Sequence, residues 1–407
     1  MNPVQHLTAE HQHFAGIQRR KEILHCGIAR TAFCLIATAV IILTSLPAPG
    51  ASGERARDFG IAPGYMNPGP LNAITDVPGV AVGQVTLTDA SKDQFTGVTA
   101  ILPHPGNLYL NKVPAGYFQG NGYGKMMGIS QIIELGEIET PILLTNTLNV
   151  ADAAIGIIEW TLDQPGNQEV RSVNAVVGET NDGGINDIRR RFVTPTIART
   201  AIETARTAEP VAEGNVGAGN GTVAFGFKAG IGTSSRVVQV GGKEYMLGVL
   251  LQANYGGDLH VLGVPVGRLL QSAKAQESAS DGSVMIIIAT DAPLSDRNLS
   301  RLAKRAILGI GRTGGTMSNG SGDYVVAFST SGTVRRTENR RSTASTVTEQ
   351  PNNRLTPLFA AVIEATEEAV YNALLAAETR QGRDGQVYEA LPQQRLLTIL
   401  AEHNQLK

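Results

Sequence analysis

The sequence has 407 residues, a formal net charge of −2 and a hydrophobic content of 42%. This length supports one large domain or two average ones, and the charge argues against a nucleic-acid-binding surface. Both cysteines, Cys26 and Cys34, lie near the N-terminus, so the rest of the chain can use neither a disulfide nor a catalytic thiol.

The first predicted element is an export signal. Arg19, Arg20 and Lys21 precede an apolar run at 32–46, and small residues follow it. A basic region, a short apolar core and small residues are typical of a secretory signal peptide, which we place at residues 1–53. The apolar run is shorter than the about 20 residues of a membrane span, and a retained anchor is the alternative. We therefore expect an exported protein, periplasmic or secreted, without stable membrane insertion after processing.

The remaining chain alternates predicted strands and helices without the regular rhythm of a doubly wound sheet, which indicates a mixed α and β fold. Apolar and β-branched patterns predict strands at 82–87, 141–147, 176–177, 245–254, 283–290 and 324–328. Helical spacing predicts helices at 150–160, 297–310 and 355–378, with shorter helical stretches ending near residue 135 and following residue 392. The 355–378 helix is expected to be amphipathic, and the basic loop before it to be exposed and mobile.

A glycine-rich cluster at 214–222 could be mistaken for a phosphate-binding loop. It lacks a Lys-Ser/Thr ending, and a strand and turn follow it, whereas a phosphate loop needs the N–H groups of a helix N-terminus. We interpret the cluster as structural. His104, His260 and His403 show no metal-ligand spacing, so we expect no metal ion and no other cofactor.

The most informative stretch is Asp281-Gly282-Ser283, which opens a long aliphatic strand and follows a polar segment, 268–280, predicted to be an exposed linker. Glycine leaves its carbonyl unshielded and tolerates strained backbone angles, so the Ser283 hydroxyl can approach the Gly282 carbonyl. Attack would convert the amide into an ester that water can cut. The new α-amine of Ser283, with an unperturbed pKa of about 7.7 to 8, can then act as base for its own hydroxyl. An ordinary turn leading into a core strand is the alternative.

The motifs around Ser283 resemble one known family. The segments 281–294, 308–314 and 318–323, with the phrase from Asn72 to Val80, are similar to the DmpA/BapA family, peptidase family S58. Its members are L-aminopeptidase/D-esterases and β-peptidyl aminopeptidases, serine hydrolases of the N-terminal-nucleophile type. The resemblance covers nearly everything after the first fifty-odd residues. It implies a self-cleaving serine aminopeptidase that releases N-terminal residues from peptides, amino-acid amides or esters through an acyl-enzyme.

The resemblance also implies the catalytic residues. Cleavage falls between Gly282 and Ser283, and Ser283 becomes the nucleophile. Asn254, at the end of a predicted strand, donates its amide to the oxyanion. Ser321 and Asp323 orient the Ser283 amine and hydroxyl. The alternatives are a strand-ending asparagine and turn residues without a catalytic role.

The loop after residue 177 supplies the candidate substrate-binding acids. An enzyme that takes only free amino termini needs an anion for the substrate ammonium, and Glu179 is the candidate by resemblance, with Asp182 nearby. A solvated loop acid is the alternative. Asn181 and Gly184 stand where some relatives carry a tyrosine, so the pocket is expected to differ in shape from theirs.

The fold implied by the resemblance is a four-layer αββα sandwich of the α/β (α+β) class, like that of DmpA and ornithine acetyltransferase. Residues 54–282 form the α-subunit part and residues 283–407 the β-subunit part of the same sandwich, so the two pieces should stay together. The resemblance also implies a homo-oligomer of αβ units, a tetramer. We expect a small peptide or amino-acid amide as the substrate and no nucleic-acid partner.

Other functions remain as alternatives. An exported, non-catalytic small-molecule-binding protein needs no cut at Ser283, and an acyltransferase could use the same fold. Ornithine acetyltransferase has a threonine nucleophile in a different local motif, whereas this chain has a serine. No Gly-x-Ser-x-Gly elbow occurs, which disfavours an α/β-hydrolase.

Overall fold

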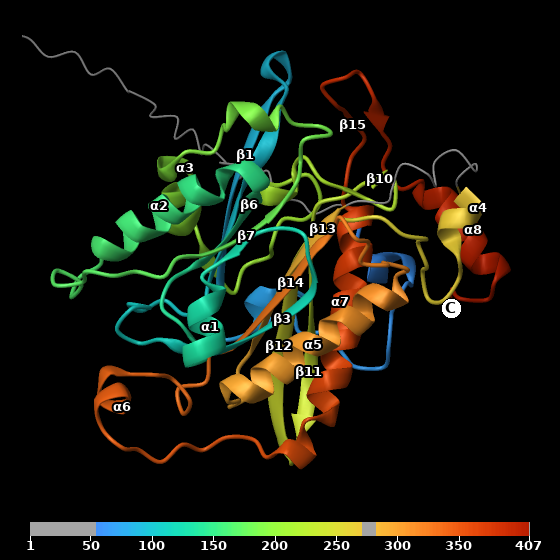
Figure 1. Ribbon diagram of the computed structural model, residues 1–407. Coiled ribbons are helices and arrows are strands. Elements are labelled where there is room, and N and C mark those ends of the chain that lie inside the picture. Colours follow the sequence, from blue (N-terminus) through green and yellow to red (C-terminus); the bar gives the residue numbers. More distant parts are fainter. Residues whose placement is uncertain (1–53, 271–281, 407) are drawn as a thin grey trace, which may run out of the picture. The chain divides into compact units, whose positions relative to one another are not determined.

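The computed structural model describes residues 54–270 and 282–406 (Figure 1). The expected signal peptide and most of the expected linker lie outside the described residues. None of the helices in these ranges combines the length and the hydropathy of a membrane span.

Two six-stranded sheets form the centre of the described region. The first sheet has the order β4-β7-β6-β2-β1-β8 and contains β1 (Ala81–Asp89), β2 (Gln94–Leu102), β4 (Met126–Met127), β6 (Ile142–Asn146), β7 (Val176–Thr180) and β8 (Arg206–Thr207). The second has the order β11-β12-β13-β14-β3-β5 and contains β3 (Val113–Gly122), β5 (Glu137–Ile138), β11 (Ile231–Val240), β12 (Lys243–Asn254), β13 (Ser283–Thr290) and β14 (Gly322–Ser329). Every predicted strand is present.

The helices and two small hairpins surround these sheets. The helices of the described ranges are α1 (Ile129–Leu135), α2 (Val150–Leu162), α3 (Pro195–Glu203), α4 (Val266–Leu270), α5 (Asp296–Arg312), α6 (Glu338–Ser342), α7 (Thr356–Leu375) and α8 (Gln393–Glu402). The hairpins pair β9 (Val223–Ala224) with β10 (Phe227–Lys228) and β15 (Arg380–Gln381) with β16 (Val387–Tyr388). The start of the expected linker is helical, because α4 runs to Leu270.

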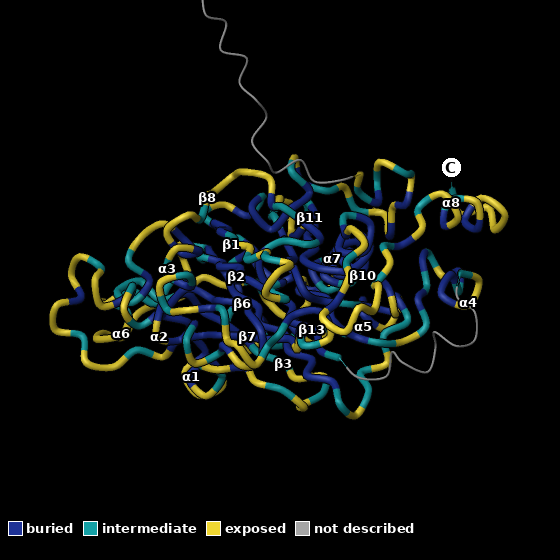
Figure 2. The backbone as a smooth tube through the Cα atoms, turned by 90° about the horizontal axis from the view of Figure 1, so that it is seen from above, coloured by how far each residue is buried: buried dark blue, intermediate teal, exposed yellow. Residues whose placement is uncertain are grey.

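Three hydrophobic cores separate four layers. One core lies between helices α2 and α3 and the first sheet, a second between the two sheets, and a third between the second sheet and helices α5 and α7. Figure 1 shows these helices on opposite sides of the strands, and Figure 2 shows the central strands of the sheets as buried. The fold is therefore the four-layer αββα sandwich expected from the sequence.

Strand β13 shows why this stretch is continuously apolar. It pairs with β12 in antiparallel and with β14 in parallel orientation, and all of its residues are buried. Ile286 and Ile288 belong to the core under α5 and α7, whereas Met285 and Ile287 belong to the core between the sheets. A strand with a core on each face needs apolar side chains at successive positions. The aliphatic run after Ser283 meets that requirement.

Helix α7 differs from its prediction. It is buried on nearly every side beyond its first turns, so the expected solvent-exposed face is absent. Glu368 on this helix is fully buried and pairs with Arg57 at 2.8 Å and with Arg236 at 2.7 Å. The residues that follow the expected signal peptide therefore cover the polar side of the helix. The sequence pattern showed that side as polar but did not show what covers it.

Candidate active site

Three strand ends bring distant residues together. Strand β12 ends at Asn254, β13 begins at Ser283 and β14 begins at Gly322. Asn254 is the register partner of Ser283 on one side, and Gly322 is its partner on the other. The strand pairing thus places the Ser283 hydroxyl, the Asn254 side-chain amide and the main chain of Gly322 together at one end of these three strands.

One backbone donor contacts both the Ser283 hydroxyl and the carbonyl group that this hydroxyl would attack in self-cleavage. The N–H of Gly322 donates to Ser283 Oγ at 3.2 Å and to the Gly282 carbonyl oxygen at 3.1 Å. A donor on a carbonyl oxygen stabilises the negative charge that develops there during attack. The hydroxyl and the preceding carbonyl therefore lie on the same side of the chain, next to a group that can assist the attack.

Gly282 lies where no side chain fits. A Cβ atom added to Gly282 would lie 2.3 Å from the Asn254 carbonyl oxygen and 2.4 Å from the Tyr255 Cα. Both contacts are with backbone, which cannot move aside without separating β12 from β13. The glycine before Ser283 is thus required by the close approach of two strands, in addition to its unshielded carbonyl.

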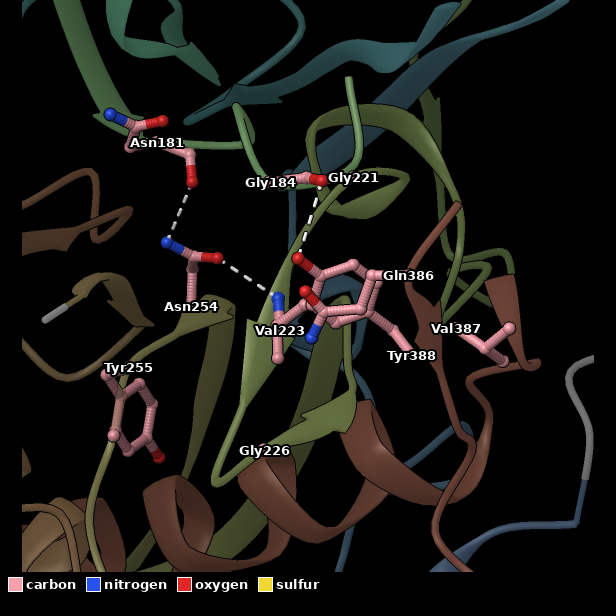
Figure 3. Close-up of a pocket in the computed structure, with 11 residues that line it drawn as sticks. Asn181, Gly184, Gly221, Val223, Gly226, Asn254, Tyr255, Gln386, Val387 and Tyr388 are labelled. Carbon is pink, nitrogen blue, oxygen red and sulfur yellow. Dashed lines mark hydrogen bonds between the residues drawn. The ribbon is translucent and has the colours of Figure 1, made fainter. Parts of the chain in front are cut away.

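Hydrogen bonds fix the side chain of Asn254, which is 9% exposed. Its Oδ1 accepts from the N–H of Val223 at 3.0 Å, and its Nδ2 donates to the Asn181 carbonyl at 3.1 Å (Figure 3). Because a primary amide has two N–H donors, one of them is left for a ligand. The amide is therefore oriented before any substrate arrives.

Ser321 and Asp323 form a buried pair at the start of β14. The Ser321 hydroxyl donates to Asp323 Oδ1 at 2.7 Å. Burial raises the pKa of the Asp323 carboxyl from 3.8 to about 6, against the opposing effect of hydrogen bonds from Ser321 and from the backbone of Val284. Asp323 Oδ2 has no hydrogen-bond partner among the described residues. This Asp323 oxygen is therefore free to accept a hydrogen bond, and it lies next to the main chain that follows Ser283.

Glu179 and Ser283 line one cavity of about 310 Å³. The other lining residues are Tyr123, Lys125, Thr147, Asn181, Asn254, Gly282 and Gly320. Glu179 is buried, accepts from the Lys125 N–H at 2.9 Å and from the Thr147 hydroxyl, and lies 3.9 Å from Lys125 Nζ. The Glu179 carboxylate thus accepts hydrogen bonds from neighbouring residues and also faces the cavity that contains the Ser283 hydroxyl.

Asp182 does not line this cavity. Its side chain is 1% exposed, and its Oδ1 accepts from Asn186 Nδ2 at 3.0 Å. Burial raises the pKa of the Asp182 carboxyl to about 7, so a substantial part of it is neutral at neutral pH. Of the two acids singled out in the sequence, only Glu179 is placed to meet a cation in the cavity.

The structure adds residues that sequence reasoning missed. Tyr123 is 70% exposed at the cavity, and Lys125 and Thr147 contact Glu179. The glycines at 120, 122 and 124 were the one local signal in the sequence, and the pairing of β3 with β14 is what places this segment beside Gly322. Within the described ranges, no group of three or more histidine, cysteine, aspartate or glutamate residues is placed to hold a metal ion.

The chain is similar to known proteins in sequence and in fold. The family model described as "Peptidase family S58" matches residues 72–388. The chain is 42% identical over 384 residues to a protein named beta-peptidyl aminopeptidase BapA from Sphingosinicella microcystinivorans, a match that covers 88% of this chain and 95% of the relative.

Solved structures show the same architecture. A protein from Pyrococcus horikoshii OT3 superposes with a TM-score of 0.82 at 46% identity, covering 87% of this chain and 100% of that one. An L-aminopeptidase D-Ala-esterase/amidase from Ochrobactrum anthropi superposes with a TM-score of 0.79 at 37% identity, covering 87% and 99%. That structure is described as a prototype for the serine aminopeptidases and a variant of the Ntn hydrolase fold.

Proposed function

The chain belongs to peptidase family S58 and is an aminopeptidase with an Ntn-hydrolase-type fold, and from this premise we propose that it activates itself by cutting its own Gly282–Ser283 bond. The processed enzyme then releases N-terminal residues through an acyl-enzyme on Ser283. The observation that carries the proposal is the register of β12, β13 and β14, which sets Asn254 and Gly322 on either side of Ser283.

Self-cleavage proceeds by an acyl shift within the chain. Ser283 Oγ attacks the Gly282 carbonyl carbon, the C–N bond breaks, and the Ser283 nitrogen takes up a proton to become an amine. The resulting ester is hydrolysed by water, which leaves a carboxylate on Gly282 and a free hydroxyl on Ser283. The N–H of Gly322 supports this step because it contacts the carbonyl oxygen that gains charge.

Catalysis then uses the new terminus. The Ser283 amine accepts the proton of its own hydroxyl as that hydroxyl attacks the substrate carbonyl. The free N–H of Asn254 stabilises the oxyanion, and the Ser321–Asp323 pair holds the amine in place. Glu179 receives the ammonium of the substrate, and such a charge-assisted contact forms only when the substrate amine is free.

The proposed substrates are peptides, amino-acid amides or esters with a free α- or β-amine. The name of the Sphingosinicella relative supports β-residues, and that of the Ochrobactrum structure supports L-residues and D-alanyl esters and amides. Among the described residues that line the cavity, only Glu179 and Lys125 are charged, and neither would distinguish one neutral substrate side chain from another. The shape of the cavity and the distance that the substrate spans between Glu179 and Ser283 therefore determine which substrates are preferred.

Two further proposals concern the whole protein. We propose that residues 1–53 are removed as a signal peptide, so that the enzyme is exported to the periplasm or secreted; their basic, apolar and small segments support this.

We also propose a homo-oligomer of αβ units, a tetramer by family resemblance. The mass of the native particle in solution tests the assembly.

The test of self-cleavage compares Ser283→Ala with the unsubstituted chain. We expect two bands on a denaturing gel for the unsubstituted protein, with the smaller band starting at Ser283, and one uncut, inactive band for the variant. Ser300→Ala, on α5, is the matched control and should cut normally. A smaller band with another first residue, or a cut Ser283→Ala chain, would refute the assignment.

The test of aminopeptidase specificity pairs each substrate with its N-acetylated form. Alanyl and β-alanyl p-nitroanilides and amides should be hydrolysed by the processed enzyme at least about 100-fold faster than their acetylated forms, because an acetylated amine carries no charge to pair with the buried Glu179 carboxylate. Equal rates would exclude Glu179 as the ammonium site while leaving Ser283 as the nucleophile. A correctly cut chain that hydrolyses none of them would favour acyl transfer or a binding role.

A further inference from the structure

A second cavity adjoins the one that contains Ser283. It measures about 270 Å³, and Asn181 and Asn254 line both cavities. The hydrogen bond from Asn254 Nδ2 to the Asn181 carbonyl lies at their boundary (Figure 3). We name it the hairpin cavity, because Gln386, Val387 and Tyr388 of the β15–β16 hairpin form part of its wall.

The hairpin cavity is lined by neutral groups. None of its eleven lining residues is charged, and four are glycines, which leave the main chain bare. The side-chain amide of Gln386 makes no hydrogen bond within the described part of the chain, and Val387 is 49% exposed. Across the cavity, the Tyr388 hydroxyl donates to the Gly184 carbonyl at 3.4 Å. Free amide groups, bare main chain and an apolar side chain match a peptide, whereas a phosphate or carboxylate ligand would find no cation.

The position of this cavity follows from what the Ser283 cavity must hold. When a substrate binds, the oxygen of its scissile carbonyl points toward Asn254. The free amine of the substrate residue that carries this carbonyl must reach Glu179. The released residue therefore fills the Ser283 cavity. The part of the substrate beyond the scissile bond needs another space, and the hairpin cavity begins at Asn254, next to the scissile carbonyl.

We propose that the hairpin cavity binds the leaving portion of the substrate, a neutral peptide segment that follows the scissile bond. This proposal rests on the aminopeptidase function and makes it more specific. The preferred substrates are then peptides with at least two residues after the scissile bond, rather than simple amides. Gln386 and Val387 are the residues that determine this preference.

The experiment compares two substrates that release the same residue. For processed enzyme, kcat/KM is measured with alanyl-glycyl-glycinamide and alaninamide, and with their β-alanyl counterparts. Val387→Trp places an indole in the hairpin cavity, and Gln386→Ala removes the free amide. Each substitution should lower the ratio of the peptide kcat/KM to the amide kcat/KM, by about tenfold for Val387→Trp. Leu162→Trp, at an exposed site on α2, is the control and should leave the ratio unchanged.

A second measurement tests the same cavity after the acyl-enzyme has formed. Added glycyl-glycinamide competes with water for the acyl-enzyme, and bound peptide in the hairpin cavity raises the share of transfer product. Val387→Trp should reduce that share by a similar factor. An unchanged ratio and an unchanged share would overturn the proposal while leaving the aminopeptidase function intact. Failure of the unsubstituted, correctly cut enzyme on all four substrates would instead overturn the proposed function, and this proposal with it.

Discussion

At the scale of single residues, hydrogen bonds hold Asn254, the proposed oxyanion donor, in one orientation. The side-chain oxygen of Asn254 accepts from the Val223 N–H, and one side-chain N–H donates to the Asn181 carbonyl. The amide therefore cannot flip without losing both hydrogen bonds. The remaining N–H is available to an oxyanion without reorganisation, which is how preorganised donors lower a barrier. The orientation comes from main-chain groups of β9 and of the segment after β7, which are distant from Asn254 in sequence.

In the uncut chain, the buried Asp323 carboxyl lowers the free energy of unfolding by an amount that depends on pH. Burial raises the pKa of its carboxyl from 3.8 to about 6, so the folded state disfavours the ionised form. The unfavourable contribution is absent below pH 3.8, grows as the pH rises from 3.8 to about 6, and is complete above that pH. A shift of this size corresponds to at most about 3 kcal/mol.

We therefore expect Asp323→Asn to stabilise the uncut Ser283→Ala chain more at pH 7.5 than at pH 4. Asparagine keeps the acceptor for Ser321 but carries no charge to bury. Urea denaturation of Ser283→Ala with and without Asp323→Asn, at both pH values, measures the effect. The gain in unfolding free energy should rise by up to about 3 kcal/mol between the two pH values. A gain that does not change with pH would contradict the raised pKa.

At the scale of elements, the close approach of β12 and β13 at Gly282 constrains the bond that we propose is cut. A Cβ there would overlap the backbone of Asn254 and Tyr255, so any side chain must push the two strands apart at the site of the cut. Misplacement of reacting groups by about 1 Å lowers a rate by about 100-fold. The proposed self-cleavage should therefore depend on the close approach of the strands at Gly282.

We expect Gly282→Ala to slow self-cleavage by about 100-fold while leaving the serine in place. The measurement is a time course of precursor and product bands in freshly synthesised protein. Gly311→Ala is the matched control, because a Cβ at Gly311 on α5 meets no atom within 4 Å. If Gly282→Ala is processed as fast as Gly311→Ala, the close approach does not govern the cut.

At the scale of the described molecule, the two pieces that the proposed cut would produce share one sheet and one core. Strands β13 and β14 from the second piece lie between β12 and β3 from the first. Helix α7, also from the second piece, packs in the same core as residues of β11 and β12. A cut at Ser283 removes one peptide bond and none of the pairing between these strands.

We therefore expect the cut enzyme to remain one particle. Size-exclusion chromatography in native buffer should give a single peak that contains both bands, and the pieces should separate only in denaturant. The uncut Ser283→Ala chain serves as the reference for elution volume. Separate native peaks for the two pieces would contradict the interleaved sheet.

Part of the fold and site was determined by local patterns in the sequence. An aliphatic run as long as the one after Ser283 fits a strand with a core on each face, and the strand before it ends at Asn254 as predicted. Motif resemblance pointed to the four-layer sandwich and to Glu179, which lines the cavity with Ser283. These features could be predicted because side-chain periodicity and local motifs are properties of neighbouring residues.

Only the tertiary structure decided which residues meet. The register of β12, β13 and β14 joins Asn254, Ser283 and Gly322. Glu179 and Asp182 are equally buried, but only Glu179 lines the cavity that contains Ser283. The burial of α7 depends on an N-terminal segment about 300 residues away, whose Arg57 pairs with Glu368. Strand register and burial depend on contacts between distant segments, and no local pattern records those contacts.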